Sequence, residues 1–301
     1  MNAVGELRVS PEAAGTRLDR YLAEPLGSRA RAASLIDAGH VTVDGNTRQK
    51  RHLLAGGELI TVTVPPVENQ PADPGAEAVP YAVAYEDEHL LIVDKPAGVV
   101  VHPARGHWTG TLAQALAGRG AAGGEPWRAG IVHRLDRETS GLLVVAKDEA
   151  VHARLKTLLA ERYLRREYLA LVAGHPQART GTIDAPIGRD RRDRLLMSID
   201  TDEPREARTH FALERRLAAA SLLRVTLETG RTHQIRVHLA AIGHPVCGDP
   251  QYGSAEAFGL ERQFLHAARL AFPHPVTEAT VDVSSPLPAD LVAALRRADS
   301  A

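Results

Sequence analysis

One carboxylate stands among basic side chains in the stretch HRLDRETSG, residues 133 to 141. Asp136 lies between Arg134 and Arg137, and small and hydroxyl residues follow it, which is typical of a loop. A carboxylate at such a place can cap the next turn, or it can act as a nucleophile that forms a covalent intermediate. A nucleophile needs a cation nearby, because burial alone raises a carboxyl pKa. The stretch by itself leaves both interpretations open.

Candidate partners for Asp136 occur in three other segments. VDKPAGVVVHP, residues 93 to 103, is a loop after a strand, and RREYLALV places Tyr168 at the entry to a strand. LETGRTHQIRVHL brings Arg231 and Arg236 close to the start of a predicted helix. Either arginine can offset the charge of Asp136, and Tyr168 taken alone is also compatible with a place in the core.

The elements that must position these residues are mainly strands. Alternating and continuous apolar runs predict two strands on either side of a polar turn at 85–89, and further strands at 141–147, 166–174, 207–217 and 221–230. One amphipathic helix is predicted at 148–163 with Asp148 as its cap, and another at 232–243, from Thr232 to Gly243. In the second helix Ile235, Leu239 and Ile242 are expected to form the apolar face. The class is therefore α+β, with a mixed, mainly antiparallel sheet and flanking helices.

Length and composition favour two folded units. A chain of 301 residues suggests about two domains, and the Pro-rich, acidic stretch 66–80 is expected to link a unit at 1–65 to one at 81–301. Seven acids and no Lys or Arg fall between Pro65 and Asp94, so the net charge of −1 becomes +6 once these acids are set aside. A basic remainder is compatible with contact to a phosphate backbone. Cys247 is the only cysteine, and no apolar run spans ~20 residues, so we expect a cytoplasmic location.

The N-terminal unit resembles the S4 RNA-binding domain. The sequence predicts a helix at 17–26 capped by Thr16, a helix at 29–39 capped by Ser28 and closed by Gly39, and strands at 41–45 and 58–64. RLDRYLA, SRARAASLIDAGHVTVDG and GGELITV carry the resemblance. It implies a small α/β domain that contacts RNA through basic side chains; the charges alone are equally compatible with a solvated face. The candidate contacts are Arg17, Arg29, Arg31, Arg48 and Lys50.

The second unit resembles the RluA/RluD family of RNA pseudouridine synthases. IVHRLDRETSGLLVVAK, REYLALV, KPAGVVVHP, TGRTHQIRVHLAAIGHPVCGDPQYG and FLHAARLAFPHP carry this resemblance, which runs from about Tyr81 to Pro275. It implies that Asp136 is the nucleophile and that Arg236 keeps it charged. Tyr168 would stack on the uracil and help remove the C5 proton. Arg134 would fill the space left by a flipped base, Arg231 would bind substrate, and Leu270 would wall the uracil pocket.

The resemblance implies an enzyme that converts specific uridines to pseudouridine, most similar to the branch that acts on large-subunit ribosomal RNA. We expect a monomer that partners RNA and uses no cofactor and no metal, since His102, His133, His233 and His238 lack ligand spacing. Three alternatives stay open: a synthase for transfer RNA or another rRNA site, a glycosidase or nucleoside hydrolase, and a non-catalytic RNA-binding or ribosome-assembly protein. The Arg-rich insertion 188–200 can contact RNA or form a solvated loop.

Overall fold

The chain folds into two compact units in a computed structural model, one over residues 1–74 and one over 75–301. The structure describes residues 3–26, 29–63, 79–103, 109–125, 127–254 and 256–300. The boundary falls inside the predicted linker, most of which lies outside the described residues, as does Ser28. The exact bounds of the linker, expected at 66–80, therefore stay a prediction.

The first unit combines a four-stranded sheet, in the order β1-β4-β2-β3, with short helices. Its elements are β1 (Ala3–Arg8), a 3-10 turn (Pro11–Ala13), α1 (Leu18–Tyr21), α2 (Arg29–Asp37), β2 (Val41–Val43), β3 (Asn46–Thr47) and β4 (Leu59–Thr63). A separate core of aliphatic side chains, among them Leu18, Ile36 and Ile60, holds the helices against the sheet. The unit therefore has its own apolar interior.

Two details of this unit differ from the sequence-based expectation. The first helix is far shorter than 17–26, since it ends at Tyr21 and only turns continue to Leu26. Pro25 explains part of this, because proline disfavours helical geometry at the residue before it and supplies no N–H. The cap position is Arg17 rather than Thr16. Strands β1 and β3 were not predicted; β1 pairs with β4 and β3 with β2, so the sheet has four strands instead of the predicted two.

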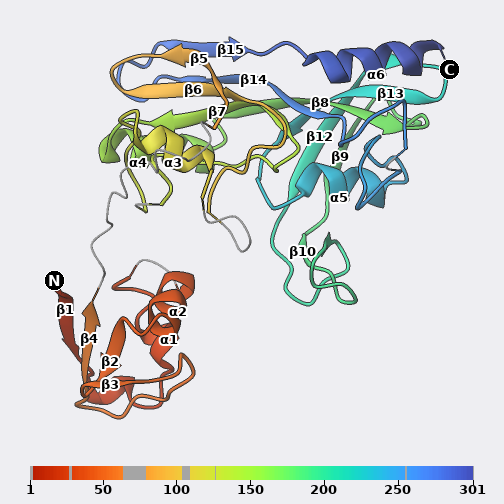
Figure 1. The fold of residues 1–301 in the computed structure, drawn as a ribbon. Coiled ribbons are helices and arrows are strands. Elements are labelled where there is room, and N and C mark those ends of the chain that lie inside the picture. Colours follow the sequence, from red (N-terminus) through yellow and green to blue (C-terminus); the bar gives the residue numbers. More distant parts are fainter. Residues whose placement is uncertain are drawn as a thin grey trace. The chain divides into compact units, whose positions relative to one another are not determined.

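The second unit is built around a nine-stranded sheet (Figure 1). Its path is β5-β6-β7-β14-β8-β13-β12-β9, and β15 pairs with β14 outside that path. Only the pair β7–β14 is parallel, so the predicted mixed, mainly antiparallel sheet is confirmed. The strands are β5 (Ala82–Glu86), β6 (Leu90–Lys95), β7 (Ser140–Ala146), β8 (Arg165–Ala173), β9 (Thr180–Asp184), β12 (Arg208–Arg216), β13 (Ala220–Leu227), β14 (Leu265–Pro273) and β15 (Thr280–Ser284).

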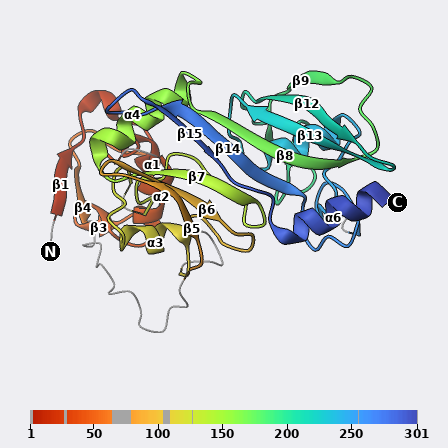
Figure 2. The same ribbon diagram turned by 90° about the horizontal axis from the view of Figure 1, so that it is seen from above.

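Helices cover both faces of the β6–β7 part of the sheet. Figure 2 shows α3 (Leu112–Ala117) and α4 (Glu149–Ala160) on opposite sides of these strands. Leu112 and Leu116 pack into the core cluster of Leu91, Val93, Leu143 and Val145, whereas Val151 and Leu155 pack into the cluster of Leu90, Ile92, Leu142 and Val144. Odd- and even-numbered residues of β6 and β7 thus lie on opposite faces of the sheet, because successive side chains of a strand point to opposite sides. The predicted cap of α4 is confirmed, because Asp148 accepts the Val151 N–H.

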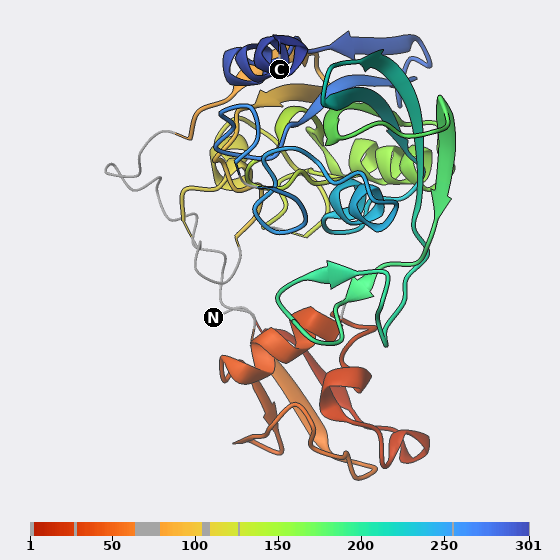
Figure 3. The same cartoon turned by 90° about the vertical axis from the view of Figure 1, so that its right-hand side faces the viewer.

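The remaining elements of the second unit are the helices α5 and α6 and the short strands β10 and β11. α6 (Ala289–Ser300) was not predicted, and it buries Leu291, Ala294 and Ala298 in the main core. α5 (Gln234–Ala241) follows β13, and β10 (Gly188–Arg189) pairs with β11 (Met197–Ser198) in a ribbon that extends away from the large sheet (Figure 3). Within the described residues, no helix combines the length and apolar character that crossing a membrane requires.

Candidate active site

Asp136 lies in the loop that leads into β7, and its side chain is 16% exposed. Its Oδ2 accepts a hydrogen bond from Arg236 Nη1 at 3.1 Å. The loop turns through backbone atoms, since the Thr139 N–H donates to the Asp136 carbonyl oxygen. No backbone N–H of the described residues donates to the Asp136 carboxylate. The Asp136 carboxylate therefore forms an ion pair and does not cap the turn.

The pairing cation is Arg236, one of the two arginines that the sequence left open. Arg236 sits in α5, and its side chain is 5% exposed. Arg231 points elsewhere, because its Nε donates to the Glu206 carbonyl oxygen at 2.8 Å. The structure thus brings residues 136 and 236 together across a hundred positions. It does not bring Arg231 to Asp136, and the expected substrate-binding role of Arg231 stays a prediction.

Asp249 is a second carboxylate at this site, and sequence reasoning missed it. It is fully buried and binds Arg236 through two hydrogen bonds, Nε to Oδ2 at 2.7 Å and Nη2 to Oδ1 at 2.9 Å. Gln251 Oε1 accepts from Arg236 Nη2 at 2.7 Å. Such a planar, two-point pair fixes the guanidinium plane. Arg236 Nη1 is then aimed at Asp136, and the GDPQYG motif that contains Asp249 was the available signal.

The charges of this network stabilise one another. Burial acts to raise the pKa of Asp249, but the hydrogen bonds and charge of Arg236 outweigh it and hold that pKa below its ordinary value. Burial lowers the pKa of Arg236, yet Asp249 and then Asp136 raise it overall. The Tyr252 ring lies 5.0 Å from the Arg236 guanidinium carbon, and its hydroxyl is 2.9 Å from His233 Nδ1. Arg236 is thus held on several sides.

The start of α5 differs from the prediction. The helix begins at Gln234, and His233, with φ of 56°, takes the position before it in place of Thr232. The buried Gln234 side chain fastens the turn, because its Oε1 accepts from the Arg231 N–H and its Nε2 donates to the Arg208 carbonyl oxygen. Gly243 ends the helix as predicted, with φ of 82°. Ile242 is 38% exposed, so it does not belong to the apolar face with Ile235 and Leu239.

Tyr168 lies in β8 and is 4% exposed. It shares the main core cluster with Leu135, which precedes Asp136, and with Ile235, which precedes Arg236. Burial raises the pKa of the Tyr168 hydroxyl, the charge of Arg166 opposes this shift, and the charge of Asp136 adds to it. The three predicted catalytic side chains, Asp136, Tyr168 and Arg236, therefore meet in one place.

The two other substrate-binding candidates, Arg134 and Leu270, have different surroundings. Arg134 is exposed, and among the described residues it has no ion pair; its charge is felt by both His102 and His233. Leu270 is 1% exposed and packs with Leu164 and Phe272 in a cluster separate from that of Tyr168. On β14 it lies opposite Arg166 of β8, and the expectation that Leu270 walls a base pocket stays a prediction.

The histidines near the site have partners other than a metal. His133 accepts the Val144 N–H, and burial lowers its pKa to about 3, so the ring is neutral. His238 bonds Thr209 Oγ1 and the Ala185 carbonyl oxygen, each at 2.8 Å. In the part of the chain that the structure describes, no three His, Cys, Asp or Glu side chains are grouped to hold a metal ion.

Lys95 ties the loop that carries Asp136 to the end of β6. This lysine is fully buried, and its Nζ donates to the carbonyl oxygens of Pro96, Val99 and Arg137 at 2.9, 3.0 and 2.9 Å. Burial lowers its pKa to about 7, against the raising effects of Glu138 and Asp136. Lys95 is thus a cross-link between two loops of the site, and its charged form is disfavoured by burial.

We expect the stability of the protein to depend on pH through Lys95. The unfolded chain binds this proton up to a pKa of 10.5 and the folded chain only up to about 7, so stability rises between these values. Relative to a Lys95→Met variant, the unfolding free energy of the parent should increase by up to about 5 kcal/mol over that range. Urea unfolding at several pH values measures this difference. A constant difference between parent and variant would show that Lys95 keeps its ordinary pKa.

Two of the candidate RNA contacts in the first unit, Arg17 and Arg29, form ion pairs with buried Asp19. Both Arg17 and Arg29 donate to its carboxylate at 3.0 Å, while their side chains stay 43% and 56% exposed. Lys50 pairs with Asp37 at 2.9 Å, and Arg48 is exposed. The side chain of Arg31 lies outside the described residues. The candidates thus keep exposed charge, although three of the four described ones have an acidic partner.

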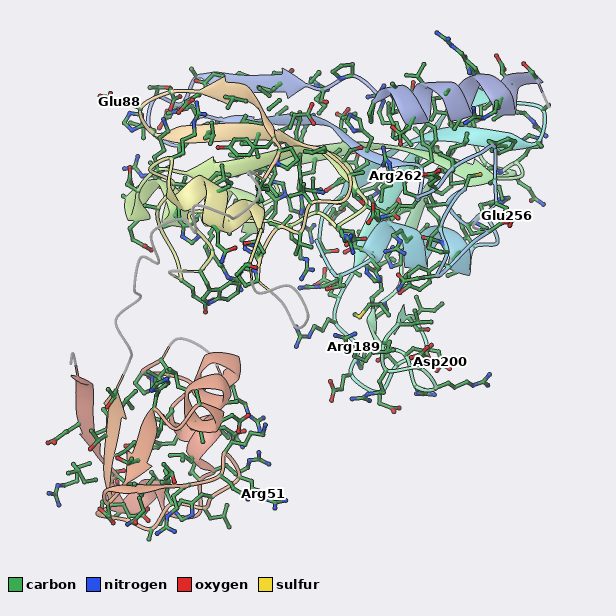
Figure 4. The ribbon with its side chains drawn as sticks, viewed as in Figure 1. Arg51, Glu88, Arg189, Asp200, Glu256 and Arg262 are labelled. Atoms are coloured by element: carbon green, nitrogen blue, oxygen red, sulfur yellow. The ribbon has the colours of Figure 1, made fainter. Side chains whose placement is uncertain are left out.

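The insertion at 188–200 forms the β10–β11 ribbon and contacts the site through Tyr252. The Met197 N–H donates to the Tyr252 hydroxyl at 2.9 Å. At the other end, Arg191 pairs with Asp200 and Asp202 at 3.0 and 2.8 Å, and Leu195 is 81% exposed. Figure 4 marks Arg189 and Asp200 on this ribbon. The ribbon is an ordered extension beside α5, with both charged and apolar groups on its surface.

Comparisons with known proteins place the chain in a family. The model of the RNA pseudouridylate synthase family matches residues 89–241, and the S4 domain model matches residues 16–60. A "Ribosomal large subunit pseudouridine synthase D" of Nitrosomonas europaea is 44% identical, over 97% of this chain and 87% of that protein. An "Uncharacterized RNA pseudouridine synthase" of Chloroflexus aurantiacus is 48% identical, over 96% and 92%.

A solved structure agrees with these relatives. "Human RNA Pseudouridylate Synthase Domain Containing 1" matches with a TM-score of 0.56 and 32% identity, over 70% of this chain and 85% of that one. The chain therefore belongs to the RNA pseudouridylate synthase family, with an S4 domain at its N-terminal end. Both resemblances drawn from the sequence are confirmed, and so is the α+β class.

Proposed function

We propose that this RNA pseudouridine synthase modifies specific uridines of large-subunit ribosomal RNA, with Asp136 as its nucleophile. The observation that carries the proposal is the 3.1 Å ion pair between Asp136 and a buried Arg236 that Asp249 holds in place. A partly buried carboxylate beside a fixed cation is poorly hydrated, which suits attack on an electron-poor carbon. The printed names of several relatives, which refer to the ribosomal large subunit, support the choice of RNA.

The proposed reaction needs no redox change. The N1–C1′ bond breaks, the uracil turns, C5 bonds to C1′, and the loss of the C5 proton is balanced by protonation of N1. Attack at C1′, attack at C6 and an elimination route all require one carboxylate at the position of Asp136. Two carboxylates that flank a bond would suit a glycosidase, but Asp249 is fully buried behind Arg236 and offers no second reacting group.

The target base must leave its stack to reach Asp136. Arg134 is two residues from the nucleophile, exposed and without an ion pair among the described residues, so its planar guanidinium is available to occupy the vacated space. Tyr168 provides an aromatic surface at the floor of the site. The exposed cations of the S4 domain and of the β10–β11 ribbon are proposed to contact the RNA backbone.

Mapping pseudouridines in ribosomal and transfer RNA tests the proposal. RNA from a strain without the protein should lack pseudouridine at one or a few large-subunit sites, and the parent gene should restore them. Restoration of only transfer RNA sites would overturn the choice of substrate. Release of free uracil from RNA by the purified protein would instead identify a hydrolase, because isomerisation retains the base.

A further inference from the structure

Three arginine side chains are buried in the described part of the chain, and one of them lacks an acidic partner. Arg236 binds Asp249 and Asp136, and Arg262, which is labelled in Figure 4, binds Asp290 at 2.7 and 3.1 Å. Arg166 is 4% exposed and forms no ion pair with any described carboxylate. A buried, unpaired charge is unfavourable for folding, and an arginine keeps its charge on burial. The burial of Arg166 without an acidic partner therefore requires an explanation.

The surroundings of Arg166 are backbone atoms and two residues of the site. Its Nη2 lies 3.3, 3.5 and 3.3 Å from the carbonyl oxygens of Leu227, Glu228 and Thr229, and its Nε has no hydrogen-bond partner. Gly230 packs against it, since a Cβ there would lie 2.8 Å from Nη1. These carbonyl contacts are long, and a neutral amide could make them. The positive charge itself is thus not needed to hold this turn.

The position of Arg166 connects it to the proposed chemistry. In β8 it lies two residues before Tyr168, so both side chains project from the same face of the strand. Tyr168 and His133 are the titratable groups that feel its charge, and His133 is neutral. The turn that Arg166 contacts leads directly into α5, which carries Arg236. A fixed positive charge therefore lies beside Tyr168, on the same face of β8.

We propose that Arg166 is a positioning residue that supplies a permanent positive field for the negative charge that develops on the uracil. This inference rests on the proposed function. When the N1–C1′ bond breaks, its electron pair stays on the base, and the negative charge spreads over the ring and its carbonyl oxygens until C5 bonds to C1′. Attack at C6 also places charge on the ring. In a dry site such a fixed charge needs no rearrangement to act.

The charge balance of the site supports this assignment. Asp136 and Asp249 carry two negative charges, and Arg236 carries only one positive charge. The anionic base would add a further negative charge during the reaction. Arg166 is the buried arginine that no described carboxylate pairs with, and its charge and that of Asp136 both act on the Tyr168 hydroxyl. Its charge is thus available to the substrate.

Replacing Arg166 by glutamine tests the proposal. We expect the single-turnover rate of pseudouridine formation to fall by roughly tenfold or more, with RNA affinity unchanged. The urea midpoint should not fall in parallel, because a buried unpaired charge is removed. Arg269→Gln is the matched control, since Arg269 lies on the neighbouring strand β14 but binds Glu167 and Asp282 and is 39% exposed. An Arg166→Gln enzyme as fast as the parent would overturn the inference.

Arg166→Lys provides a readout that a structural role would not move. A buried lysine has a lowered pKa, so its charge is lost as pH rises, whereas the parent arginine stays charged. The rate of the Arg166→Lys enzyme relative to the parent should fall with rising pH. The neighbouring groups Tyr168, His133 and Asp136 are the same in both enzymes, so their effects on the rate cancel in this ratio. A pH-independent ratio, or a lysine enzyme as slow as the glutamine one at low pH, would overturn the inference. If the unsubstituted protein itself formed no pseudouridine, the proposed function would be overturned together with this inference.

Discussion

An Asp136→Asn enzyme is expected to form pseudouridine on the order of a thousandfold more slowly than the parent, or not at all. Asparagine has nearly the size of aspartate but is neither charged nor nucleophilic. Arg236 keeps its two hydrogen bonds to Asp249, so the fold and the RNA affinity should persist. Single-turnover assays on an unmodified large-subunit rRNA transcript, together with RNA binding and urea unfolding, measure these three quantities.

Asp282→Asn is a suitable control for this substitution. Asp282 also pairs with an arginine, Arg269, but it lies on β15 and its side chain is 42% exposed. The control should retain the parent rate. An Asp136→Asn enzyme that works at more than about a tenth of the parent rate would exclude Asp136 as the nucleophile, since tenfold is far less than the loss of a covalent catalyst produces.

Asp249→Asn is expected to weaken both folding and catalysis. The substitution leaves Asp136 as the only described carboxylate paired with buried Arg236, next to the uncharged Gln251 amide. Breaking a buried ion pair on one side destabilises a protein by about 3 to 5 kcal/mol. Without its two-point partner, the guanidinium is free to turn fully onto Asp136 and block it. We therefore expect a fall in rate of about a hundredfold, the effect of misplacing a catalytic group by about 1 Å.

A double variant separates these two effects. Asp249→Asn combined with Arg236→Met removes both buried charges, so it should regain much of the stability that the single variant loses, as hydrophobic replacements of buried pairs do. Activity should stay low, because Asp136 then lacks its cation. Equal stability of the parent and the Asp249→Asn variant would contradict this account. Because the pKa of Asp249 is held low in the folded state, this stability is present above its ordinary pKa of 3.8 and is lost as pH falls below it.

Motifs and local patterns predicted the elements best where one short segment contains the whole signal. The helix at Glu149–Ala160 was predicted from its apolar stripe and its Asp148 cap, because both signals lie within one segment. The first helix was predicted too long, since turn geometry after Tyr21 depends on Pro25 and on packing against the S4 sheet. The role of Leu270 stays a prediction, because an apolar residue in a motif does not indicate which layer of the sheet it faces.

The sequence by itself determined the family, the α+β class and Asp136 as the candidate nucleophile, because these depend on residue types at fixed local spacing. Residue types alone left both Arg231 and Arg236 open as the cation, although the family resemblance favoured Arg236, and they assigned no role to Asp249 or Arg166. Only the tertiary structure decided these points. Whether an arginine is paired depends on which strand and helix ends meet, and Arg236 reaches Asp136 because α5 and the loop before β7 converge. Arg166 was left with carbonyl oxygens alone by the same packing.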